Sequence, residues 1–178
     1  MTVADIGAGE GYYTIRLATR VGEDGRVLAQ DIVPEVRDRL AERVNRESLD
    51  NVSVKLGTPE DPMLPANSFD RVFMVHMYHE IGSPYEIIWR MRPSLKHEGL
   101  VIVVDMERPA GTHGIPLSLL KCEFEAAGYS LVESQPMPLA GAFYAVFAPV
   151  GGRPRPEKIT PCALPAKNSA SQQPKPTH

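Results

Sequence analysis

The stretch Thr2-Val-Ala-Asp-Ile-Gly-Ala-Gly-Glu-Gly11 decides how the rest of the chain is interpreted. It begins with a short apolar run, typical of a buried strand, and continues into three glycines at alternate positions. Glycines at this spacing allow a tight turn and let a ligand approach the backbone closely. Because Asp5 and Glu10 place negative charge at the same turn, we expect a ligand with a positive centre rather than a pyrophosphate.

Strand-like and helix-like segments alternate from this turn to about residue 149. The expected strands are Thr2–Ile6, Arg26–Ile32, Asn51–Leu56, Phe69–Val75, Leu100–Asp105, Tyr129–Val132 and Ala142–Phe147. The expected helices are Thr14–Val21, one that opens at Pro34, one behind a capping box at Ser83 that Pro93 bends or ends early, and Leu117–Ala127. This order predicts an α/β fold, a doubly wound and mostly parallel sheet with helices on both faces.

Ligands of such sheets bind beyond the carboxyl ends of the strands. The site is therefore expected among four segments, which are 5–13, 30–33, 57–62 and 76–82. Asp31 ends the second strand, where a carboxylate can accept hydrogen bonds from two ribose hydroxyls. The alternative is that Asp31 only favours the N-terminus of the helix at Pro34, but the glycine-rich turn makes ribose binding the better interpretation.

Together these residues resemble the class I S-adenosylmethionine-dependent methyltransferases. The resemblance is carried by four stretches in the family's order, namely 3–14, 28–32, 57–65 and 67–72. It continues through residues 98–105 and covers roughly Thr2 to Pro149. It implies a Rossmann-like sheet of seven strands with the last strand antiparallel, and S-adenosyl-L-methionine as the cofactor.

The resemblance also implies roles for single residues. The methionine part of the cofactor would be held by Asp5 and the backbone of Gly7, Ala8, Gly9 and Gly11. Asp31 would bind the ribose and Ile32 would flank the adenine. The adenine amino group would be reached by Glu60 or Asp61, of which Asp61 is preferred, and His76 would lie beside the methyl donor.

The segment His76-Met-Tyr-His-Glu80 follows the fourth expected strand. Methyl transfer depends chiefly on alignment and on removal of water, and needs a base only when the acceptor loses a proton. His76, His79 and Glu80 are the candidate bases, although one histidine can equally be structural and Glu80 can cap a helix. These residues with His113 also suggest a zinc site, but the spacing is not H-E-x-x-H and no cysteine pair assists, so we predict no metal.

Composition places further bounds on the chain of 178 residues, which has a formal net charge of −3 and only two cysteines. Residues 150–178 are rich in proline and net positive, so we expect a folded domain over 1–149 and a disordered or loosely draped tail after it. The acidic remainder lacks the basic stripe of a nucleic-acid-binding surface, and no segment is apolar over the length of a membrane span. Because two cysteines do not describe a disulfide-stabilised extracellular protein, we expect a location in the reducing cytoplasm. Cys122 is expected to be buried on a helix face, while a disulfide with Cys162 stays open.

The predicted function is methyl transfer to an unidentified acceptor, preferably a small molecule. One alternative is a non-catalytic module that binds the nucleoside cofactor, or a decayed or truncated enzyme, because the chain begins almost at the first strand. The family normally places a helical segment before it. A nicotinamide-dependent oxidoreductase is disfavoured by the glycine spacing and by Glu10. The oligomeric state is not predicted.

Overall fold

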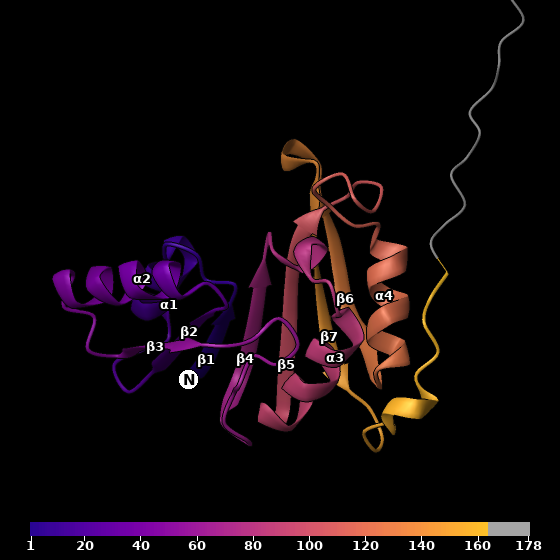
Figure 1. Cartoon of the computed structure of the whole chain (residues 1–178), viewed down its shortest axis with the longest axis horizontal. Helices are drawn as coiled ribbons and strands as arrows, with labels where there is room; N and C mark the ends of the chain where they lie inside the picture. The colour runs from indigo at the N-terminus through magenta and orange to yellow at the C-terminus, as the bar shows by residue number, and fades with distance from the viewer. Residues whose placement is uncertain (164–178) are drawn as a thin grey trace, which may run out of the picture.

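The computed structural model describes residues 1–163, which form seven strands and four α-helices (Figure 1). The strands are β1 (Thr2–Ile6), β2 (Arg26–Asp31), β3 (Val52–Leu56), β4 (Phe69–Val75), β5 (Leu95–Met106), β6 (Tyr129–Met137) and β7 (Ala142–Pro149). The α-helices are α1 (Tyr12–Arg20), α2 (Pro34–Arg46), α3 (Pro84–Met91) and α4 (Leu117–Ala126). The short 3-10 helices are η1 (Tyr78–Glu80), η2 (Arg92–Ser94), η3 (Pro138–Ala140) and η4 (Pro156–Lys158).

All seven strands join one sheet in the order β3-β2-β1-β4-β5-β7-β6. Strands β1 to β5 pair in parallel, whereas β7 pairs antiparallel with both β5 and β6. The predicted doubly wound sheet with one antiparallel strand is therefore confirmed. The order reverses at β1 and β4, which places the switch point of the sheet beside the glycine-rich turn.

Helices cover the two faces of the sheet in two pairs. Helices α1 and α2 pack on the face that carries Val3, Val27 and Ala29. Helices α3 and α4 pack on the other face, around Phe124, which stacks on Phe147 with ring centroids 4.0 Å apart. Successive strand residues point to opposite faces, so Asp5 lies under α1 while Ile6 points toward the α3 side.

Element boundaries differ from expectation at a few points. Helix α1 begins two residues early, because Gly11 takes a left-handed backbone conformation that ends the turn. Strands β5 and β6 extend beyond their predicted ends. Ser83 is the N-cap residue of α3, but its side chain makes no capping hydrogen bond, so the predicted capping box is wrong in that detail.

Residues 150–163 lie against α3. The indole nitrogen of Trp89 donates to the Pro154 carbonyl at 2.7 Å, and the Arg153 guanidinium lies 3.6 Å from the centroid of the same indole ring. Arg92 donates to the Val150 carbonyl at 2.9 Å. The expected boundary at residue 149 stays a prediction, and residues 164–178 of the expected tail lie outside the described residues.

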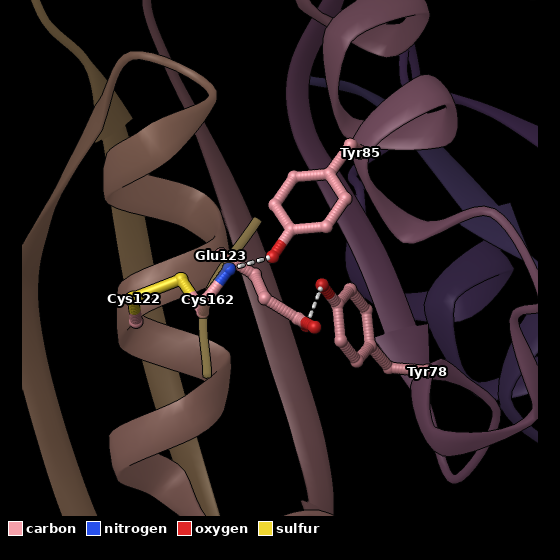
Figure 2. Close-up of a disulfide and its surroundings, with 5 residues drawn as sticks. All are labelled: Tyr78, Tyr85, Cys122, Glu123 and Cys162. Atoms are coloured by element: carbon pink, nitrogen blue, oxygen red, sulfur yellow. Dashed lines mark hydrogen bonds between the residues drawn. A yellow bond between two sulfur atoms is a disulfide. The ribbon is translucent and has the colours of Figure 1, made fainter. Parts of the chain in front are cut away.

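A disulfide joins Cys122 of α4 to Cys162 and fastens this segment (Figure 2). The backbone N–H of Cys162 donates to the Tyr85 hydroxyl of α3 at 2.6 Å. Cys122 is exposed, so its predicted burial is wrong: Leu119, Leu120 and Phe124 take the inward face of α4, and Cys122 lies on the outward one.

None of the helices in residues 1–163 combines the length and the apolarity needed to span a bilayer.

Candidate active site

A cavity of about 390 Å³ opens beyond the carboxyl ends of β1, β2 and β4. All four segments expected to form the site contribute to its lining. The lining residues are Ile6, Gly7, Gly9, Gln30, Asp31, Ile32, Val33, Val36, Thr58, Pro59, His76, Met77, Glu80, Ile81, Gly82 and Ile87. Parallel strands end at one edge of the sheet, so residues far apart in sequence meet there.

The glycine-rich turn needs its glycines. Gly7 and Gly11 have φ values of +66° and +84°, a backbone conformation that residues with a side chain rarely adopt. A Cβ at Gly7 would lie 2.9 Å from the Met77 side chain, and one at Gly11 would lie 2.4 Å from Leu40. The absence of a side chain at Gly7 therefore keeps this wall of the cavity as bare backbone, as a closely approaching ligand requires, whereas Gly11 allows the close approach of Leu40.

Asp31 ties the turn to the end of β2. One carboxylate oxygen accepts the Gly9 N–H at 3.0 Å and the other accepts the Val33 N–H at 3.0 Å. The residue is 8% exposed and faces the cavity. Each carboxylate oxygen keeps a further lone pair, so two neighbouring hydroxyls of one ligand can donate to Asp31 at the same time.

Asp5 lies behind the turn and not in the cavity wall. It is 2% exposed and accepts a hydrogen bond of 2.6 Å from the Thr14 hydroxyl. Burial raises the pKa of the Asp5 carboxyl to about 6, although the Thr14 hydrogen bond works in the opposite direction. Asp5 can therefore act on a ligand only through its charge. Ala8 and Gly11, also expected to hold the cofactor, do not line the cavity either.

The expected adenine side of the site is only partly as predicted. Ile32 lines the cavity, whereas Glu60 and Asp61 do not. The Asp61 carboxylate accepts the Met63 N–H at 2.8 Å and lies 3.7 Å from the Arg90 guanidinium. Thr58 and Pro59 occupy the corresponding wall, so an adenine contact through Asp61 or Glu60 stays a prediction that requires this loop to rearrange.

Beyond the end of β4, His76 and Glu80 line the cavity beside the apolar side chains of Met77 and Ile81. His76 has a φ of +55°, an unfavourable conformation for a residue other than glycine, and its N–H donates to the Val104 carbonyl at 2.8 Å. The Glu80 side chain is 69% exposed. Water therefore reaches this side of the cavity.

His79 lies just outside the lining and is held by Asp105 at the end of β5. The ring nitrogen Nδ1 is 2.8 Å from Asp105 Oδ1, and the His79 backbone N–H donates to the other oxygen at 3.2 Å. Asp105 is fully buried and also accepts the Met106 N–H at 2.7 Å. A carboxylate at Nδ1 fixes the proton there and leaves a lone pair on Nε2, which lies 3.8 Å from the Glu80 carboxylate.

Asp105 was missed from sequence, whereas Gln30 and Thr58 lie in the expected segments 30–33 and 57–62 without having been assigned a role. Asp105 ends a strand at the ligand-binding edge, as Asp31 does, and the same criterion would have found it. Gln30 is buried in the cavity wall, and its amide nitrogen has no hydrogen-bond partner among the described residues. Nothing in the local sequence marks that amide as unpaired.

Comparison with known proteins decides the family. A family model described as "Methyltransferase domain" matches residues 3–99, which is more than half of the chain. The chain belongs to this methyltransferase family. The matched stretch contains every wall of the cavity described above.

Two curated relatives and one solved structure illustrate the likeness. The chain is 46% identical over 69 residues to nocamycin O-methyltransferase of Saccharothrix syringae, covering 38% of this chain and 24% of the relative. It is 27% identical over 126 residues to a protein-L-isoaspartate O-methyltransferase of Methanococcoides burtonii. That match covers 68% of this chain and 54% of the relative. The crystal structure of a SAM-dependent methyltransferase from Aquifex aeolicus superposes with a TM-score of 0.78 at 26% identity, covering 84% of this chain and 82% of that one. The chain thus spans between a quarter and about half of the curated relatives' length.

Proposed function

We propose that this methyltransferase-family chain binds S-adenosyl-L-methionine in the cavity and transfers its methyl group to a small-molecule acceptor. The observation that carries the proposal is the Asp31 carboxylate, which faces the cavity while holding the bare backbone of the glycine-rich turn. A ribose fits the two free lone pairs, and the turn leaves room for the methionine part. The unpaired amide of Gln30 offers a further donor in the same wall.

The residues fit a cationic ligand. Backbone from Gly7 and Gly9 would lie along the methionine part, with the charge of Asp5 behind it, and Ile32 would flank the adenine. When bound, S-adenosylmethionine supplies an electrophilic methyl group on a sulfonium. Met77, Ile81 and Ile87 form the apolar part of the cavity wall, although water reaches the wall at Glu80. Methyl transfer therefore requires the bound cofactor and acceptor to displace that water.

Substitution of Asp31 by alanine tests the cofactor site. Hydrogen bonds to a charged carboxylate contribute on the order of 2–3 kcal/mol, so we expect S-adenosylhomocysteine to bind about 30- to 150-fold more weakly. Isothermal titration calorimetry measures the affinity, and circular dichroism checks that the variant remains folded. The exposed Asp38 on α2 provides the matched control Asp38→Ala, which should bind as the parent does. Unchanged affinity in folded Asp31→Ala protein would rule out ribose binding at this residue.

Where the acceptor loses a proton, we assign its capture to Nε2 of His79, which Asp105 orients, ahead of His76 and Glu80. The His79→Ala variant should lose about 100-fold or more in kcat on a hydroxylated acceptor, the usual contribution of a positioned base. Its affinity for S-adenosylhomocysteine should stay within a factor of two or so, since His79 does not line the cavity. A loss of cofactor affinity that matches the loss of kcat would place His79 in the cofactor site instead.

A non-catalytic module that binds the same nucleoside is the second candidate, favoured by the exposed acceptor side at Glu80. Turnover of any member of a panel of hydroxylated metabolites excludes it.

We further propose no nucleic-acid or membrane partner and a cytoplasmic location. The disulfide between Cys122 and Cys162 counts against this location, because a reducing compartment keeps such cysteines as thiols. Alkylation of the two cysteines in the cell tests it: free thiols would support the cytoplasm, and an intact bond would contradict it.

A further inference from the structure

Three metal-ligating side chains meet beside the acceptor end of the cavity. One ligand atom each of His79, Glu80 and His113 lies within 4.8 Å of the others. Nε2 of His79 is 3.8 Å from the Glu80 carboxylate, and the rings of His79 and His113 lie edge to face with centroids 6.2 Å apart. His113 comes from the connection between β5 and α4, a segment separate in sequence from the other two residues.

A second observation concerns the residue behind this cluster. Asp105, fully buried, accepts from Nδ1 of His79 and leaves the Nε2 lone pair facing Glu80. A carboxylate that holds the distal nitrogen of a histidine is the usual support behind a metal-bound imidazole, because it fixes the tautomer and makes the other nitrogen a better ligand. The Glu80 carboxylate lies 3.8 Å from Nε2 and is itself an acceptor, so it does not occupy that lone pair, and a cation between the two atoms would satisfy both.

We propose that His79, Glu80 and His113 form a binding site for a divalent transition-metal ion. Two imidazoles and one carboxylate suit ions such as Zn²⁺ or Fe²⁺ and leave coordination positions open. The zinc set weighed from sequence differs, because it included His76, which is outside this cluster. Ligand atoms around one tetrahedral ion lie about 3.3 Å apart, so Glu80 and His113, both exposed, need to move inward.

The site deepens the proposed function, on which this step rests, by naming the acceptor as an oxygen nucleophile. With the ion bound, an acceptor hydroxyl at an open position would have a lowered pKa and would lose its proton to solvent water. Its oxygen would then attack the methyl carbon, forming a carbon–oxygen bond as the carbon–sulfur bond breaks and that electron pair leaves with sulfur. With the ion bound, Nε2 of His79 is a ligand, and proton capture by His79 is not needed.

Zinc titration of the untagged chain of 178 residues tests the site. We expect one zinc ion to bind per chain by isothermal titration calorimetry, and Co²⁺ to give the visible absorption of a low-coordinate site. His113→Ala should weaken zinc binding at least tenfold, and Asp105→Asn should weaken it by about 10- to 100-fold. His97→Ala is the matched control, since His97 is exposed at the opposite end of β5 and should bind zinc as the parent does.

The outcomes separate this site from the cofactor site. S-adenosylhomocysteine affinity should be unchanged in His113→Ala, which does not line the cavity. The absence of saturable zinc binding, or equal zinc affinities of His113→Ala and the parent, would overturn the metal site and leave the cofactor proposal standing. Zinc binding without any binding of S-adenosylhomocysteine would support the metal site and contradict the proposed function.

Discussion

Substitution of Asp5 by asparagine is expected to stabilise the ligand-free protein at pH 7.5 by up to about 3 kcal/mol, at about 1.4 kcal/mol per pKa unit. The folded-state pKa of Asp5 is raised from 3.8 to about 6, chiefly by burial. Between these two values the unfolded chain releases the proton and the folded chain keeps it, so the free energy of unfolding falls as the pH rises. Asparagine carries no charge and keeps an oxygen that can accept from Thr14.

The pH dependence makes the expectation specific. The stability difference between Asp5→Asn and the parent should be small at pH 4, grow toward pH 6.5 and then level off, as measured by urea unfolding at each pH. Thr14→Val is the opposing variant: without the hydroxyl the ionised carboxylate loses its only side-chain donor among the described residues, so stability at pH 7.5 should fall. A stability difference that is the same at pH 4 and pH 7.5 would contradict this account of Asp5.

The stabilising variant should bind the cofactor less well. Asp5 contributes only its negative charge, from behind the glycine-rich turn, and a neutral asparagine removes the attraction for a cationic ligand. Stability and affinity are therefore expected to change in opposite directions in this one variant, as happens where a functional site holds an unfavourable group.

Reduction of the disulfide between Cys122 and Cys162 is expected to lower the free energy of unfolding by about 4 kcal/mol, the chain-entropy value for a loop of this size. The two cysteines lie 40 residues apart, so the bond restricts a long loop of the unfolded chain. Urea unfolding with and without a phosphine reductant measures the difference.

The reduced state should also loosen the segment 150–163 from α3, because Cys162 supplies the hydrogen bond to Tyr85. Glu123, next to Cys122, points inward and accepts from the buried Tyr78 hydroxyl at 2.7 Å, so the core contact of α4 should persist (Figure 2). The double variant Cys122→Ser with Cys162→Ser is the control and should not respond to the reductant. Two titratable thiols in the untreated protein, or equal stability in both conditions, would contradict the bond.

Sequence patterns predicted the fold well because local signals agreed with one another. The apolar run before the glycines specified β1, Pro34 marked the start of α2, and the alternation of elements implied the parallel sheet. Asp31 was predicted at the cavity because a carboxylate at the end of a strand is positioned by the fold itself. The antiparallel β7 was expected from the family resemblance.

The contacts that sequence could not supply join residues far apart in the chain. The pairing of His79 with Asp105 spans 26 residues and depends on the register of β4 against β5. Asp61 has the expected residue type, but the loop turns its carboxylate toward Met63 and Arg90, which no local pattern reveals. The exposure of Cys122 likewise follows from how α4 meets the sheet, with Phe124 inward.

A crystal structure with S-adenosylhomocysteine tests the central claim most directly. The account predicts one nucleoside beyond the ends of β1, β2 and β4, with both ribose hydroxyls on the Asp31 carboxylate and the amino-acid part along Gly7 and Gly9. Density for the nucleoside elsewhere, or a ribose that leaves Asp31 without contact, would contradict it.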